Sequence, residues 1–228
     1  MIGVMKKFKT ASPAVKASMA LLFANLILKG LSLISGPIFT RIMPTDQYGI
    51  VSTFQSWQSL LAVIVTLNLS QGVFNNGMLE FKENRDQFEF ALVVITVVCT
   101  GLFLLIFEIF KTSLLNMFEM PLVMVYIMAL YFLFVPAYQF WSGRQRYEYK
   151  YKALSIVTVC IGLFSLLLGV LFVLNVSSGK EAIARVYAME GVNIAVGIFF
   201  FVIIAVKAKF KLRIEYCIYA LKFNIPLI

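Results

Sequence analysis

Long apolar runs, separated by short charged segments, make up most of the chain. A helix needs about 20 mostly apolar residues to cross the hydrocarbon core of a bilayer. Six runs are close to this length or longer, and they lie at 17–40, 47–79, 90–107, 120–143, 153–179 and 182–206. This pattern predicts an all-α protein, a polytopic membrane helix bundle with six transmembrane helices and the start of a seventh.

The composition favours the same class of protein. Of the 228 residues, 61% are hydrophobic and 14% are charged, against roughly 25% charged residues in an ordinary soluble domain. The mean hydropathy is +0.90. Because a soluble domain of this size cannot bury so much apolar surface, a soluble globule, a disordered chain and a collagen-like fibre are excluded.

The residue types that are missing limit the chemistry. The chain has no histidine, which removes serine–histidine triads and histidine metal sites. Its three cysteines, Cys99, Cys160 and Cys217, lie in apolar segments without CxxC spacing, so no disulfide framework or zinc site is indicated. We therefore expect no cofactor, no metal site and no enzymatic activity.

A seventh apolar run begins near Glu215 and stops at the last residue. It is too short to cross a bilayer, and a charged chain end inside hydrocarbon is costly. We therefore expect residues 1–213 to form a six-helix N-terminal lobe. Residues 214–228 are expected to be the truncated start of a C-terminal lobe in a longer protein.

The basic residues are distributed unevenly between the two sides of the predicted bundle. Fourteen lysines and arginines fall in the N-terminal segment and in the loops after the second, fourth and sixth runs, and four fall on the other side. Since basic loops stay in the cytoplasm, both ends of the six-helix unit are expected there. The net charge of +9 then reflects topology and lipid headgroups in a multi-pass protein of the cytoplasmic (inner) membrane, with no need for nucleic acid.

One face of the first run is polar. Asn25, Lys29, Ser32 and Gly36 follow one another at helical spacing. Lys29 lies near the middle of the run, where a lysine costs about 2.5–3.5 kcal/mol on insertion scales. Two interpretations remain open for Lys29: it faces a hydrated cavity, or it pairs with an acid on another helix.

The second run has a comparable face near its start. Ser52, Gln55, Ser56 and Ser59 lie at i, i+3, i+4 and i+7, and Asn68, Gln71, Asn75 and Asn76 continue the polarity toward the expected cytoplasmic end. Such a face lines a water-filled pathway or forms hydrogen bonds between helices, and the spacing is compatible with both.

The sixth run contains an acid, Glu190, followed by Asn193 and Gly197 at helical spacing. Three roles are open for Glu190: pairing with Lys29, binding a coupling cation, or carrying a proton. The fifth run carries small residues at steps of three and four, which indicates close helix packing.

The segment WSGRQRYEYKYK at 141–152 is basic and aromatic and lies between the fourth and fifth runs. Arg144 and Glu148 are spaced as an i,i+4 pair, as are Glu148 and Lys152. This composition is typical of an interfacial anchor at headgroup level. Contact with an anionic headgroup at the cytoplasmic entrance is the alternative.

The stretch RIMPTDQYG, Arg41 to Gly49, carries a resemblance to a known family. With its flanking apolar residues it resembles the first two helices of polysaccharide flippases of the O-antigen and capsule type, in the multidrug/oligosaccharidyl-lipid/polysaccharide exporter superfamily. LKFNIPLI at the end resembles the opening of that family's seventh helix. The resemblance implies a transporter of two six-helix lobes around a central cavity.

That resemblance implies the transport of an undecaprenyl-pyrophosphate-linked oligosaccharide across the cytoplasmic membrane for surface polysaccharide biosynthesis, with H⁺ or Na⁺ as a coupling ion. It also implies that Arg41 and Asp46 hold the outer loop and that Gly49 allows close packing. We expect the pyrophosphate and sugars to be bound by a set of polar residues from three runs: Lys29, Asn25, Ser32, Gln55, Ser59, Glu190 and Asn193.

Two alternatives remain. A cation-coupled drug exporter of the same superfamily would use acids in the cavity, and Glu190 is the one acid well within a run. A membrane glycosyltransferase or polysaccharide polymerase is the third interpretation. The short loops and the lack of a paired-carboxylate motif speak against it.

Overall fold

The structure, a computed structural model, describes residues 13–224. The N-terminal lysines Lys6, Lys7 and Lys9 and the last four residues of the predicted seventh run lie outside the described residues. The described part is all-helical. Its helices are α2 (Pro13–Ile42), α3 (Thr45–Val65), α4 (Gly72–Glu80), α5 (Arg85–Ile109), α6 (Lys111–Phe118), α7 (Leu122–Tyr147), α8 (Tyr151–Asn175), α9 (Glu181–Lys207) and α10 (Ile214–Asn224).

Five of these helices are long and apolar enough to span a membrane, which confirms a multi-pass helical bundle. They are α2 over Met19–Ile42, α5, α7, α8 and α9. Of the six predicted spans, the one in the second run is not among these five. Its helix, α3, has 21 residues, but its glutamines, serines and threonines make it too polar to belong to this set.

The second run is also interrupted. α3 ends at Val65, and residues 66–71 form a turn before α4 begins at Gly72. Leu67 and Asn68 have φ of 51° and 48°, a left-handed conformation that a right-handed helix cannot continue through. An uncharged stretch of 33 residues therefore becomes two helices of different length.

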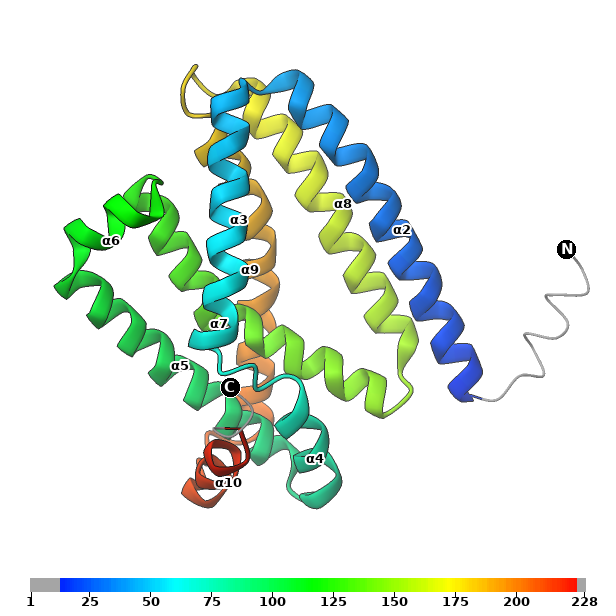
Figure 1. Cartoon of the computed structure of the whole chain (residues 1–228). Coiled ribbons are helices and arrows are strands. Elements are labelled where there is room, and N and C mark those ends of the chain that lie inside the picture. Colours follow the sequence, from blue (N-terminus) through cyan, green and yellow to red (C-terminus); the bar gives the residue numbers. More distant parts are fainter. Residues whose placement is uncertain (1–12, 225–228) are drawn as a thin grey trace, which may run out of the picture.

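α9 is the central helix of the bundle. α7 packs against one side of it and α8 against another, while α2 covers α8 (Figure 1). Gly197 permits α9 to lie close to the main chain of α7, because a Cβ there would lie 2.7 Å from the main-chain carbonyl of Phe134. The small-residue face of α8 packs as predicted, with Gly162 against Leu28 and Gly169 against Phe39.

The two ends of the bundle differ. We call the end that carries residues 81–84, 148–150 and 208–213 the basic end; α4 and α10 pack against α5 there (Figure 1). Phe81 contacts the rings of Phe88, Tyr216 and Tyr219 and so joins these elements. α10 is thus an 11-residue helix packed against the basic end. The prediction that residues 214–228 begin a second lobe is not tested by this packing.

The outer surface of the bundle is apolar. α2 exposes Leu22, Phe23, Leu33 and Ile34, each more than half accessible. A surface of this kind is stable only against hydrocarbon or another apolar partner. Inside, a cluster around Phe88 and Phe140 fills the basic half, and a second cluster around Phe54 and Phe132 fills the other half.

Candidate functional site

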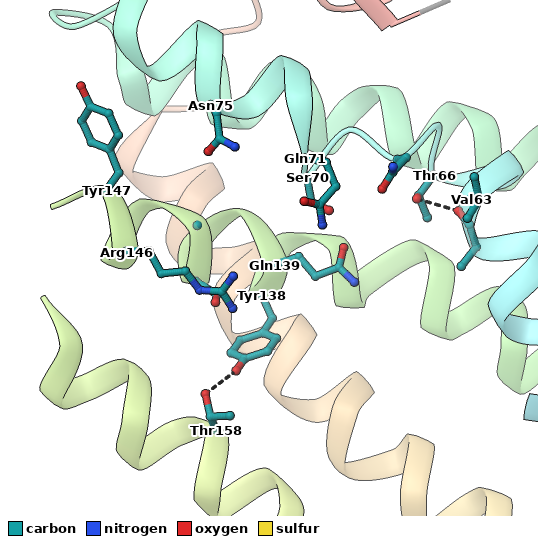
Figure 2. Close-up of a pocket in the computed structure, with 14 residues that line it drawn as sticks. Val63, Thr66, Ser70, Gln71, Asn75, Tyr138, Gln139, Arg146, Tyr147 and Thr158 are labelled. Atoms are coloured by element: carbon teal, nitrogen blue, oxygen red, sulfur yellow. Dashed lines mark hydrogen bonds between the residues drawn. The ribbon is translucent and has the colours of Figure 1, made fainter. Parts of the chain in front are cut away.

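A polar cavity of about 600 Å³ lies toward the basic end of the bundle. Its walls are the end of α3, the 66–71 turn, α4, α7 and α8 (Figure 2). The lining residues are Ala62, Val63, Thr66, Asn68, Ser70, Gln71, Asn75, Tyr138, Gln139, Ser142, Gly143, Arg146, Tyr147 and Thr158. Its volume is within the range of small-ligand sites, roughly 300–1,000 Å³.

The hydrogen-bonding groups of this cavity come from both of its sides. Gln71 and Ser70 point toward Gln139 of α7 (Figure 2). The Tyr138 hydroxyl lies 3.0 Å from the Thr158 hydroxyl, which joins α7 to α8 at the cavity wall. Amide and hydroxyl groups of this kind can hydrogen-bond sugar hydroxyls and phosphate oxygens alike.

Among the described residues that line the cavity, Arg146 supplies the only charge, and none carries a carboxylate. In the described part of the chain Arg146 forms no ion pair. A guanidinium presents several N–H donors in a planar fork suited to phosphate oxygens. The cavity therefore attracts anions.

A second cavity of about 250 Å³ shares Arg146 and Thr158 with the first. It also reaches α2 at Leu21, Ala24 and Asn25. The guanidinium of Arg146 thus faces two adjoining cavities. Asn25, predicted as a site residue, lines the second of them.

Arg144 lies only two residues from Arg146 but is fully engaged. Its Nη1 forms ion pairs with Asp86 and, at 3.3 Å, with Glu89 of α5, and its Nε contacts Glu148 at 2.8 Å. Two residues correspond to about 200° around a helix, so the two arginines face opposite sides. Arg144 is a structural clamp between α5 and α7, whereas Arg146 faces the cavity.

The turn after α7 completes this clamp. Lys150 binds the other carboxylate oxygen of Glu148 at 2.5 Å. Burial alone would raise the pKa of Glu148, but the hydrogen bonds from Lys150 and Arg144 outweigh it and lower that pKa. The predicted i,i+4 pair of Arg144 and Glu148 is present, while Glu148 binds Lys150 instead of Lys152.

A third cavity, of about 160 Å³, lies between α2, α3 and α9, nearer the opposite end. Ser32 and Gln55, both predicted as site residues, line it together with Arg185. Arg185 is held in place because it donates to the carbonyl of Ser165 at 2.9 Å and stacks 3.9 Å from the ring centroid of Phe39.

Lys29 is exposed and lines none of these three cavities. It lies on α2 between Asn25, which lines the second cavity, and Ser32, which lines the third. In the described residues Lys29 forms no ion pair, so the pairing with Glu190, one of the interpretations left open by the sequence, is absent from this structure. The polar face of α2 therefore contributes one residue to each of two cavities, and Lys29 lies between these residues along the helix.

The remaining predicted residues lie apart from the cavities. Ser59 is exposed on α3 and donates to the carbonyl of Gln55 at 2.8 Å. Glu190 is 2% exposed, and the Asn193 amide donates to it at 2.9 Å. The structure thus separates the predicted set into three groups: cavity-lining residues, exposed residues that line no cavity, and buried Glu190 with its partly buried neighbour Asn193 on α9.

The stretch from Arg41 to Gly49 has a structural role, but its contact with the rest of the bundle comes from Gln47, a residue that was not expected to make it. The side-chain oxygen of Gln47 accepts a hydrogen bond from the backbone N–H of Ala182 at 3.3 Å, and so caps the start of α9. Asp46 accepts from the amide of Gln47 at 3.0 Å. A Cβ on Gly49 would meet nothing within 4 Å, so the expected close packing there is absent.

Arg146 is the residue that the sequence reasoning missed as a site residue. The signal was present, because the segment 141–152 is basic and contact with an anionic headgroup is one interpretation of it.

Comparisons with protein-family models, with curated proteins and with solved structures found no match for this chain. The function therefore has to be argued from the site itself.

Proposed function

We propose that this chain is a six-helix lobe of a flippase that moves a polyprenyl-pyrophosphate-linked oligosaccharide across the cytoplasmic membrane. In this proposal α3 is the sixth span, and its polar face is turned to the lumen of the lobe. The N-terminus and the basic end face the cytoplasm, in keeping with the distribution of basic residues.

The observation that carries the proposal is the Arg146 cavity. It combines one unpaired guanidinium with many neutral hydrogen-bonding groups and no carboxylate. A pyrophosphate with attached sugars needs this combination, since the guanidinium binds the charge and the amides and hydroxyls bind the sugars. The apolar outer surface of α2 suits a prenyl tail that stays in lipid.

The arrangement of the cavities supports transport rather than binding alone. The first two cavities share Arg146, and the polar face of α2 leads from Asn25 through Lys29 to Ser32 beside the third. An anion that leaves Arg146 would next meet Lys29 and then Arg185. In a low-dielectric surrounding, such successive cations lower the barrier for an anionic headgroup.

The proposal is tested by surface polysaccharide export in cells that carry the full-length protein. Arg146→Ala should strongly reduce export at normal protein level, because the pyrophosphate loses its charged ligand, and Arg146→Lys should retain part of it. Lys152→Ala is the matched control, since Lys152 is exposed near the basic end and lines none of the three cavities. Normal export by Arg146→Ala at normal protein level would contradict the proposal.

One observation favours the cation-coupled drug exporter as a second candidate. Glu190 is buried in α9 without an ion-pair partner among the described residues, as a cation-binding acid would be. Export of cationic dyes from the same cells separates the candidates. A drug exporter would lose dye efflux on Glu190→Gln and keep it on Arg146→Ala, whereas a flippase would show no dye efflux to lose.

A further inference from the structure

Glu190 is a buried acid inside a membrane-spanning helix. It lies nine residues into α9, about 14 Å from the start of the helix at 1.5 Å per residue. Its side chain is 2% exposed and accepts one hydrogen bond, from Asn193 at 2.9 Å. In the part of the chain that the structure describes, no lysine or arginine lies within ion-pair distance of it.

Arg185 is the charged group nearest to Glu190 along α9, and it is turned away. Residues five apart lie about 140° apart around a helix. The guanidinium of Arg185 instead donates to the carbonyl of Ser165 in α8 and stacks on Phe39 in α2. Its influence on Glu190 is a longer-range attraction that favours the charged form.

The other helices packed against α9 bring little charge to Glu190. α7 contributes the Tyr131 hydroxyl group, which interacts electrostatically with the acid. α3 contributes the neutral amide of Gln58. α8 has no charged residue after Lys152, and α5 has none between Glu89 and Glu108.

An ionised carboxylate is costly in such a place. Without a paired cation, a buried acid is driven toward its neutral form, because the protein interior solvates the charge poorly. The amide nitrogen of Gln58 is also buried and has no hydrogen-bond acceptor. Gln58 lies next to the acid and interacts with it, so its amide can donate to the carboxylate when Glu190 becomes charged.

We propose that Glu190 is a proton-binding site, protonated and occluded in this structure, and that it releases its proton when α3 moves relative to α9. A proton passes from the carboxyl group to water, and the resulting carboxylate accepts hydrogen bonds from Gln58 and Asn193. Proton binding by Glu190 is inferred from this geometry and does not depend on the proposed function. A role of the proton in driving export does rest on the proposed function.

The path to water runs past Gln55. Gln55 lies one turn before Gln58 on α3, lines the third cavity and is exposed. Its amide donates to the sulfur of Met189, the residue next to Glu190 in the chain, at 3.4 Å. Separation of this contact would admit water to the carboxyl group.

Infrared spectroscopy of the purified full chain tests proton binding without any substrate. At neutral pH the wild type should show the carbonyl stretching band of a protonated carboxylic acid. Glu190→Gln should remove that band and, because the amide resembles the neutral acid in shape, leave the fold intact. Glu181→Gln is the control, because Glu181 lies at the start of the same helix and accepts a hydrogen bond from the Gly179 backbone N–H.

Three outcomes decide the matter. A band lost in Glu190→Gln and kept in Glu181→Gln supports the proposal. A spectrum in which Glu190→Gln removes no part of this band overturns it, and Glu89→Gln identifies any part of the band that comes from the other buried acid, Glu89. If Glu190→Gln does not fold, Glu190→Asp replaces it and should shift the band; an unshifted band overturns the proposal. Export driven by an imposed pH gradient is a separate measurement, so loss of the flippase hypothesis would leave this result standing.

Discussion

Arg144 and Arg146 are two residues apart, but the structure predicts that they contribute differently to stability. Replacing Arg144 should destabilise the protein, whereas replacing Arg146 should not. Glu89 is 3% exposed and its ion-pair partner is Arg144, which is itself 19% exposed. Removing one partner of a buried ion pair typically costs about 3–5 kcal/mol, because the other group must either keep an unpaired charge or change its protonation state. Asp86 is 42% exposed and adds little.

We therefore expect Arg144→Ala to destabilise the protein by about 3 kcal/mol, the lower end of that range. For a chain of this length this corresponds to a fall in Tm of roughly 6–12 °C. Arg146→Ala should leave the Tm almost unchanged, because Arg146 forms no ion pair in the described part of the chain. The double variant Glu89→Leu/Arg144→Met should recover most of the loss, since it removes the buried carboxylate, while Glu148 keeps Lys150 and Asp86 is 42% exposed.

The measurement is thermal loss of the helical circular dichroism signal in one detergent at one protein concentration. The variants Arg144→Ala and Arg146→Ala differ only in which side of α7 loses its cation. Equal Tm values for the two single variants would refute the assignment of Arg144 as clamp and Arg146 as cavity residue.

Two further predictions concern helix packing. Gly197→Ala should cost about 1–3 kcal/mol through overpacking against the main chain of Phe134, whereas Gly191→Ala on the same helix should cost nothing, because nothing lies within 4 Å of a Cβ there; equal Tm values for the two would contradict this packing. Gln47→Ala should cost about 1–2 kcal/mol, because it leaves the Ala182 N–H buried without an acceptor. The same thermal assay checks both, and an unchanged Tm in Gln47→Ala would rule out the cap.

The sequence predicted five of the membrane-spanning helices and some of their packing faces. It did not predict that the second run is broken into two helices. The length of the uncharged apolar runs identified five spans correctly, because the ability of a helix to cross a bilayer depends mainly on its length and composition. The break after α3 depends on the left-handed backbone of Leu67 and Asn68. Neither residue type requires that conformation, so no local signal marked it.

The site was harder to predict because helical spacing identifies a face but not what lies opposite it. Asn25 and Ser32 were placed on one face of α2, and both line cavities. Arg144 was assigned its neighbour Glu148, but its contacts with α5 join residues 55 or more positions apart. Only those contacts reveal that Arg144 is engaged and Arg146 is free to bind a ligand.

The most direct test of the account is binding of undecaprenyl pyrophosphate to the purified protein, measured by calorimetry in one detergent. A charge-assisted hydrogen bond contributes about 1.5–3 kcal/mol. Arg146→Ala should therefore weaken the affinity by roughly 10- to 150-fold, while Lys152→Ala should leave it unchanged. Equal affinity of the wild type and Arg146→Ala would show that the Arg146 cavity does not bind the pyrophosphate and would contradict the proposed function.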